Sequence, residues 1–208
     1  PVLHDVGSGC LLPTERYGLA HEPTPQESIA AGVGLVLFSG DKLLGGPQSG
    51  IVVGKRDLVD LLARHPLARA IRIDKFSLAA LTATLLHYLK GEALMDIPIW
   101  RMIAASEKTI RDRAQHWQKQ LGEGAGVEPA RSAIGGGSLP GETLPSWVMT
   151  LSCGDVPGGP EEVTGRLRRA DPPVVARIEE NQVLLDPRSV LPDEDEPLLR
   201  AVQGAMGR

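Results

Sequence analysis

A single lysine, Lys42, lies in a glycine-rich loop, which is an unusual place for an ammonium group. The loop runs over residues 39–50 and also holds one carboxylate, Asp41, and four glycines. A partly desolvated amine loses its proton more readily, and the neutral amine forms Schiff bases with carbonyl compounds. Glycines let the backbone approach an anionic group closely. The loop therefore predicts either covalent amine chemistry or a surface hairpin with a solvated lysine.

Two short apolar runs, residues 33–38 and 51–53, flank this loop and are predicted to be buried strands. A loop between such strands emerges at the edge or end of a sheet, where open α/β folds bind their ligands. A further strand is predicted at residues 2–6, which delivers Asp5 at its carboxyl end, before Gly7-Ser8-Gly9. Judged from the residues alone, such an aspartate caps a turn.

Two arginines three positions apart, Arg69 and Arg72, lie in a predicted turn or short helix over residues 66–74. Two guanidinium groups on one side of such a segment form a fork that suits a tetrahedral oxyanion. A solvated basic face is the usual explanation of such a pair. The residues alone leave both interpretations open.

Helix signals alternate with strand signals along the chain, which indicates an α/β fold. Thr24-Pro25-Gln26-Glu27 predicts a helix start with a capping box, and Asp193 is expected to cap the last helix with Glu196 at its third position. Leucines at helical spacing predict a helix at residues 77–90. Further helices are expected at residues 55–65, 106–121 and 161–169, a strand at 147–151, a hairpin around 180–181, and loops at 122–126 and 135–145.

The composition excludes several classes of protein. The 208 residues carry a formal net charge of −4, so the chain is not expected to bind RNA mainly through a basic surface. Its two cysteines, Cys10 and Cys153, are far apart, which predicts neither a zinc site nor a disulfide framework and fits a reducing cytoplasm. No apolar run approaches the roughly 20 residues of a membrane span. The histidines show no ligand spacing, and no metal is expected.

Several motifs resemble those of bacterial selenocysteine synthases, the L-seryl-tRNA(Sec) selenium transferase family. The most specific is Ser-Gly-Asp-Lys-Leu-Leu-Gly-Gly-Pro-Gln at residues 39–48; the others are Asp-Val-Gly-Ser-Gly at 5–9, the segment 17–27 and Gly-Gly-Gly-Ser-Leu-Pro at 135–140. The resemblance covers essentially the whole chain and implies the aspartate-aminotransferase fold of fold-type I pyridoxal-phosphate (PLP) enzymes. Residues 1–90 would then be the second half of the PLP-binding large domain, and residues 91–208 the small carboxyl-terminal α/β domain.

The resemblance also implies roles for individual residues. Lys42 would bind PLP covalently, Asp5 would pair with the protonated pyridine nitrogen, and Ser39 would bond the cofactor phosphate. Asp41 is expected to be catalytic, with its role left open. The matching positions in the family bind the anionic selenium donor, so Arg69 and Arg72 would hold selenophosphate.

The implied reaction converts seryl-tRNA(Sec) to selenocysteinyl-tRNA(Sec) through an aminoacrylyl intermediate, in a cytoplasmic homodecamer. Because the sequence begins at Pro1 and leads directly into a strand, it is expected to lack an amino-terminal tRNA-binding domain and the first half of the PLP domain, and to be inactive in isolation. Two alternatives stay open: a PLP-dependent lyase acting on a small amino acid or sugar acid, and a non-catalytic fragment that only oligomerises. The intact motif at residues 41–46 weighs against the lyase.

Overall fold

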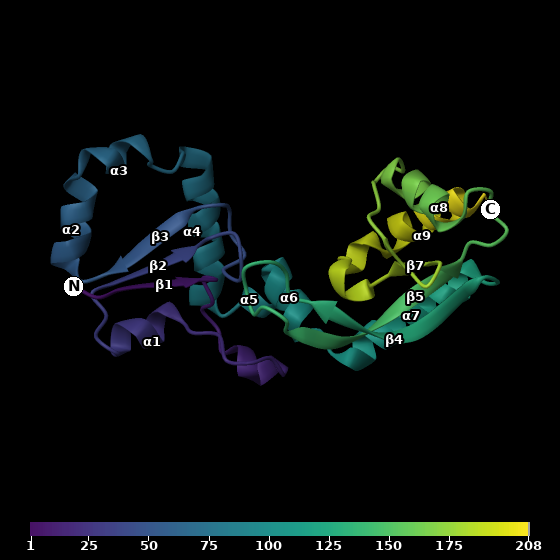
Figure 1. The fold of residues 1–208 in the computed structure, drawn as a ribbon, viewed down its shortest axis with the longest axis horizontal. Coiled ribbons are helices and arrows are strands. Elements are labelled where there is room, and N and C mark those ends of the chain that lie inside the picture. The colour runs from purple at the N-terminus through teal and green to yellow at the C-terminus, as the bar shows by residue number, and fades with distance from the viewer. Residues whose placement is uncertain (208) are drawn as a thin grey trace. The chain divides into compact units, whose positions relative to one another are not determined.

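A computed structural model describes residues 1–207, and their contacts divide them into two compact units (Figure 1). The first unit comprises residues 1–104 and 133–142, and the second comprises residues 105–132 and the described chain from 143 onward. This division differs from a boundary after Lys90, because helices α5 (Ala93–Asp96) and α6 (Pro98–Ala104) belong to the first unit. Trp100 of α6, for example, donates a hydrogen bond to the carbonyl of Leu43.

The first unit is built on a three-stranded sheet of β1 (Leu3–Gly7), β2 (Leu35–Ser39) and β3 (Gly50–Gly54), in the order β1-β2-β3. Strand β1 runs parallel to β2, and β3 runs antiparallel to β2. The three predicted strands are confirmed, with bounds that shift by one or two residues. Since β1 and β2 are parallel neighbours, their carboxyl ends, with Asp5 and Ser39, lie at the same edge of the sheet.

Two helices of the first unit, α1 and α4, have well-defined caps. Helix α1 (Pro25–Ala30) has the expected capping box: Thr24 Oγ1 accepts from the Glu27 amide at 3.2 Å, and Glu27 Oε2 accepts from the Thr24 amide at 2.8 Å. Helix α4 (Lys75–Lys90) is capped by Asp74 and stopped by Gly91, whose φ of 74° is left-handed. The remaining helical segments are η1 (Thr14–Tyr17), α2 (Arg56–Arg64) and α3 (Pro66–Ala70).

The leucine stripe of α4 is less covered than its spacing suggests. No residue of α4 is buried, and Leu89 at the end of the stripe is 84% exposed. Leu81 and Leu85 line an apolar cavity of about 610 Å³ together with side chains of α1 and the sheet. Spacing thus located the helix correctly but not the extent to which its apolar face is packed.

The second unit packs three helices on a four-stranded sheet (Figure 1). The sheet has the order β4-β5-β7-β6. Its core includes Trp117, Met149, Val163, Val183 and Val202, drawn from both layers. The elements are α7 (Glu107–Leu121), β4 (Ala125–Ala133), β5 (Thr143–Ser152), α8 (Gly159–Arg168), β6 (Arg177–Glu179), β7 (Gln182–Leu185), η2 (Pro187–Ser189), η3 (Pro192–Glu194) and α9 (Asp195–Met206).

Three features of the second unit bear on the sequence predictions. The hairpin around Glu180 and Asn181 is confirmed, with φ of 47° and 61°, as a two-residue turn of the type I′ class requires. Strand β4 was not predicted, because it is a half-exposed edge strand that contains Pro129 and lacks a continuous apolar run. The expected cap at Asp193 is wrong, since Pro192 starts a 3₁₀ turn and α9 begins only at Asp195.

None of the helices in residues 1–207 combines the length and the apolar character that crossing a bilayer requires. The longest of them, α4, has 16 residues. At a rise of about 1.5 Å per residue, such a helix falls short of a hydrocarbon core about 30 Å thick.

Candidate active site around Lys42

The loop that carries Lys42 is held by backbone hydrogen bonds that need glycine. The Gly40 amide donates to the Ser49 carbonyl at 2.9 Å, and the Gly46 amide donates to the Gly40 carbonyl at 2.8 Å. A Cβ on Gly40 would lie 2.2 Å from Ser49 Oγ and 2.6 Å from the Pro47 carbonyl oxygen. Gly40 therefore permits the close return of the chain that presents Lys42 at the end of β2.

Two aromatic side chains fix the carbonyl groups that follow Lys42. The Tyr88 hydroxyl donates to the Leu44 carbonyl at 2.9 Å, and Trp100 Nε1 donates to the Leu43 carbonyl at 2.8 Å. Burial raises the pKa of Tyr88 far above its ordinary value, so the hydroxyl keeps the proton that it donates. The side chains of Leu43 and Leu44 are fully buried, so the loop is also held by packing against the core.

The amine of Lys42 lies beside Gly7 and has no bonding partner within residues 1–207. The position that a Cβ of Gly7 would occupy lies 3.9 Å from Lys42 Nζ and 4.0 Å from Asp5 Oδ1. Asp5 Oδ1 accepts a hydrogen bond from the Gly7 amide at 3.0 Å, which orients the carboxylate. Lys42 and Asp5, which the sequence predicted as site residues, therefore both lie near Gly7.

A second glycine faces the same lysine from the loop at residues 134–142. A Cβ on Gly137 would lie 3.1 Å from Lys42 Cε and 3.2 Å from Nζ. Glu142, at the end of this loop, accepts a hydrogen bond from the Ala20 amide at 3.1 Å. The loop and the Lys42 segment enclose a cavity of about 350 Å³, whose polar lining residues are Asp41, Lys42 and Ser138.

The other predicted site residues are distributed unevenly. Ser39 ends β2, three residues before Lys42, and Asp41 is exposed at the mouth of the cavity that it lines. Arg69, in α3, and Arg72, just after it, are both exposed and do not line that cavity. The structure thus brings Asp5, Asp41 and Lys42 together and leaves the two arginines on a separate surface of the same unit.

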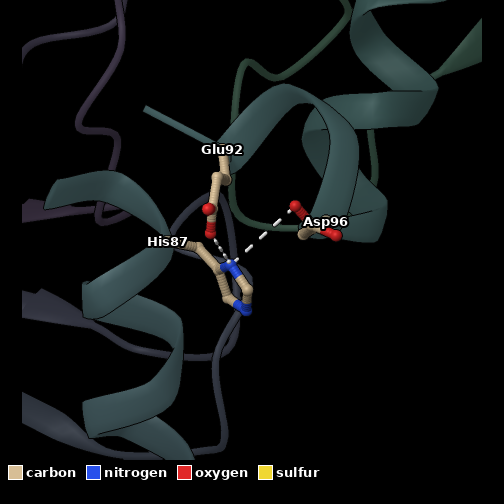
Figure 2. Close-up of side chains that lie close together, drawn as sticks. All are labelled: His87, Glu92 and Asp96. Atoms are coloured by element: carbon tan, nitrogen blue, oxygen red, sulfur yellow. Dashed lines mark hydrogen bonds and ion pairs between the residues drawn. The ribbon is translucent and has the colours of Figure 1, made fainter. Parts of the chain in front are cut away.

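One cluster outside the site has ligand atoms close enough for a cation (Figure 2). His87 Nδ1 lies 2.9 Å from Glu92 Oε2 and 3.9 Å from Asp96 Oδ2. The same imidazole nitrogen faces both carboxylates, and Lys90 Nζ lies 3.9 Å from Glu92. We interpret the cluster as polar contacts, including the hydrogen bond between His87 and Glu92, that fix the turn from α4 to α5 and give this histidine a structural role.

Four residues of the site were missed as functional positions at the level of the sequence. Tyr88 and Trp100 are distant in the chain from Lys42, so no spacing connects them with its loop. Gly137 and Ser138 lie at residues 135–140, which were noted as a family motif but expected to form only a loop. That family resemblance is the signal that could have marked them as site residues.

Comparison with known proteins decides the family. The family model described as L-seryl-tRNA selenium transferase matches residues 1–191. The chain belongs to the L-seryl-tRNA selenium transferase family. Relatives from Moorella thermoacetica and Geobacter sulfurreducens, both named L-seryl-tRNA(Sec) selenium transferase, are 49% and 46% identical over 99% and 98% of this chain.

The chain spans about half the length of these selenium transferases, since it covers 45% of each of the two relatives. The structure of D-glucosaminate-6-phosphate ammonia-lyase matches all of this chain and 49% of its own, with a TM-score of 0.58 at 17% identity. Identity that low supports the fold alone. The comparisons confirm the predicted α/β fold of the aminotransferase-like, fold-type I class.

Proposed function

We propose that the complete gene product transfers selenium to seryl-tRNA(Sec) and uses PLP held at Lys42. The observation that carries this proposal is the unpaired Lys42 amine at the carboxyl end of β2, close to the Asp5 carboxylate at the end of β1. Open α/β folds bind ligands at this edge of the sheet. High identity to named selenium transferases supports this substrate in preference to the many other substrates that share the fold.

The residues around Lys42 fit a pyridoxal group. A free amine is required to bind the aldehyde, and a carboxylate near it is required for the pyridine nitrogen. Both groups lie about 4 Å from the position that a Cβ of Gly7 would occupy, so they belong to the same neighbourhood. When bound, PLP supplies an electron sink that stabilises negative charge at the Cα of the substrate.

The proposal assigns a role to each of these side chains. Lys42 would hold the cofactor covalently, and its amine, once released, would take the Cα proton. Asp5 would pair with the protonated pyridine nitrogen, and Ser39 would hydrogen-bond the cofactor phosphate. Asp41 would either assist departure of the seryl β-hydroxyl, which leaves as water, or handle the phosphate.

The exposed arginine pair is assigned to the selenium donor. Arg69 and Arg72 would bind selenophosphate through charge-assisted hydrogen bonds and position its selenium to add to the β-carbon. Water would then cleave the P–Se bond, which releases inorganic phosphate. Neither arginine makes an ion pair or a hydrogen bond within residues 1–207, so both are free to take an anion. The family likeness supports a cytoplasmic homodecamer as the working assembly, which light scattering on the complete gene product would test.

The experiment combines covalent trapping with turnover. The complete gene product is incubated with PLP, reduced with borohydride and mapped by mass spectrometry, and selenocysteinyl-tRNA(Sec) formation is followed in parallel. Lys42→Ala is expected to lose both the adduct at residue 42 and the turnover, whereas the exposed control Lys55→Ala keeps both. If Lys42→Ala kept its turnover and PLP was trapped on another lysine, the assignment of Lys42 would be overturned. Activity on a phosphorylated sugar acid, without activity on seryl-tRNA, would favour the lyase.

A further inference from the structure

One hydroxyl at the Lys42 cavity has no partner. Ser138 is 5% exposed, and its Oγ is buried without a hydrogen bond to any atom of residues 1–207. Buried polar side-chain atoms are normally bonded, so an exception needs an explanation. A ligand that enters the cavity would supply the missing partner.

The surroundings of Ser138 place that partner beside Lys42. Ser138 lines the cavity of about 350 Å³ together with Asp41 and Lys42. A Cβ on its neighbour Gly137 would lie 3.2 Å from Lys42 Nζ, so this stretch of backbone runs close to the lysine side chain. The next residue, Leu139, is buried and has a φ of 47°, a backbone conformation that non-glycine residues adopt only when the surroundings enforce it. The backbone therefore holds the Ser138 side chain at this wall.

The unpartnered hydroxyl of Ser8 does not offer the same opportunity. Ser8 is 1% exposed, and its Oγ also lacks a partner within the described chain, but the residue does not line this cavity. Its carbonyl is used to accept the Leu43 amide at 2.9 Å. Of these two serines, Ser138 is the one that belongs to the lining of the cavity beside the lysine.

The chemistry of the cavity lining indicates what Ser138 would contact. A lysine ammonium only donates hydrogen bonds and an aspartate carboxylate only accepts them, whereas a serine hydroxyl does both. A hydroxyl on the ligand also does both, so it can pair with Ser138 in either direction. The other walls include Leu43, Pro98, Ile99 and Ile134, which are apolar and offer a ligand no side-chain hydrogen bond.

We propose that Ser138 hydrogen-bonds the β-hydroxyl of the seryl group, and so selects a small β-hydroxy aminoacyl ester over the same ester without its hydroxyl. This proposal rests on the proposed function, because it assumes that an aminoacyl-tRNA enters the cavity of Lys42. It makes Ser138 a specificity residue that acts before any bond is broken. A site that bonds a substrate hydroxyl discriminates against the analogue that lacks it.

The test is a thermodynamic cycle on binding, with the hydroxyl removed from either partner. The complete gene product, free of cofactor so that no turnover occurs, is titrated with the same tRNA carrying either a seryl or an alanyl group. One neutral hydrogen bond, roughly 0.5–1.5 kcal/mol, corresponds to about a 2- to 12-fold preference for the seryl form. Ser138→Ala and the near-isosteric Ser138→Cys are expected to abolish that preference.

The Tm of Ser138→Ala, compared with that of a matched serine variant, separates a role in specificity from a structural role. Since the Ser138 hydroxyl has no internal partner, Ser138→Ala should not lower the Tm. Ser28 has the same exposure of 5%, but its hydroxyl is bonded to the Thr24 carbonyl and to His4. Ser28→Ala is therefore expected to lower the Tm while keeping the preference for the seryl group.

Each result decides between the proposals. A seryl preference that survives in both Ser138 variants would overturn the specificity role alone. Equal weakening of seryl- and alanyl-tRNA binding would also overturn it, because the hydroxyl would then serve the tRNA body or the fold. If the unmodified protein failed to bind or convert seryl-tRNA, the proposed function would fall and the role of Ser138 with it.

Discussion

Gly137 lies against Lys42 so closely that a Cβ on the glycine would come within 3.2 Å of the lysine Nζ. The same glycine has a φ of 80°, a conformation that residues with a side chain rarely adopt. Both observations apply at one position, so the loop at residues 134–142 shapes the surroundings of the amine. The run of three glycines is then a wall of the candidate site rather than a linker.

Gly137→Ala is expected to destabilise the complete gene product by about 1–3 kcal/mol through backbone strain. It should also reduce borohydride trapping of PLP at residue 42, because the new methyl group displaces the Lys42 side chain. Denaturant unfolding and mass spectrometry provide the two measurements. Gly136→Ala is the matched control, since no atom lies within 4 Å of its Cβ position, and it should change the free energy of unfolding by less than about 0.5 kcal/mol. Equal effects of the two variants would contradict the wall role.

The arginine pair predicts a split between two half-reactions. If Arg69 and Arg72 hold the selenium donor, replacing either with lysine should spare elimination from seryl-tRNA and impair selenium addition. Loss of one charge-assisted contact costs about 1.5–3 kcal/mol, which is roughly a 10- to 150-fold loss of affinity for selenophosphate. A lysine should restore only part of it, because a point charge cannot reproduce the planar fork.

The measurement is selenocysteinyl-tRNA formation against selenophosphate concentration, with elimination followed separately. Arg56→Lys is the control, because its side chain is 95% exposed on α2. Equal damage to both half-reactions would indicate a role in tRNA binding or folding. If neither half-reaction were impaired, the arginine pair would be interpreted as a solvated basic face without a role in catalysis.

The hydroxyl of Tyr88 is expected to stabilise the Lys42 loop. Tyr88→Phe leaves the Leu44 carbonyl without the donor at 2.9 Å, while Leu43 keeps its bond from Trp100. An unsatisfied buried carbonyl costs about 1–3 kcal/mol, which should appear in the free energy of unfolding. Tyr17→Phe serves as the control, since the Tyr17 hydroxyl makes no hydrogen bond within residues 1–207. Similar losses in both variants would show that ring packing, and not this hydrogen bond, matters.

A pH-dependent contact involves His21 and two carboxylates. His21 Nδ1 and Nε2 each lie 3.3 Å from an Oε2 atom, of Glu15 and Glu27 respectively. The hydrogen bond that His21 donates to the Glu15 carboxylate raises the pKa of His21 above its ordinary 6.5. The pKa values of Glu15 and Glu27 lie below their ordinary 4.5, chiefly through backbone hydrogen bonds, with His21 contributing.

The signs of these shifts define a window of pH. Because the pKa of His21 is raised on folding, its contribution to stability is complete below pH 6.5 and is lost as the pH rises through the folded-state pKa. Because the pKa values of Glu15 and Glu27 are lowered on folding, their contribution is complete above pH 4.5 and is lost as the pH falls through the folded-state pKa values. The contact is therefore complete between these limits, and salt should weaken it because the groups are exposed.

Proton NMR of the imidazole ring checks this contact directly. Glu15→Gln should move the His21 titration midpoint down toward 6.5, whereas Glu123→Gln, in the other unit, should leave it unchanged. A midpoint that did not respond to Glu15→Gln would contradict the assignment of the raised pKa to this pair.

Much of the local structure was predictable because its causes are local. The capping box at Thr24, the stop at Gly91 and the turn at Glu180 and Asn181 depend on residues a few positions apart. Strands β1, β2 and β3 were found because apolar runs between glycines report burial directly. The predicted helix cap at Asp193 was wrong because a neighbouring residue, Pro192, begins a 3₁₀ turn that includes Asp193.

The amino-acid sequence by itself determined the family and which residues could do chemistry, because both are carried by motifs such as the one around Lys42. Only the tertiary structure decided which residues meet. Parallel pairing of β1 with β2 brings Asp5 toward Lys42, and the return of residues 133–142 to the first unit brings Gly137 and Ser138 there. Such contacts join segments up to about a hundred positions apart, so no local spacing encodes them, and packing and backbone hydrogen bonds select them on folding.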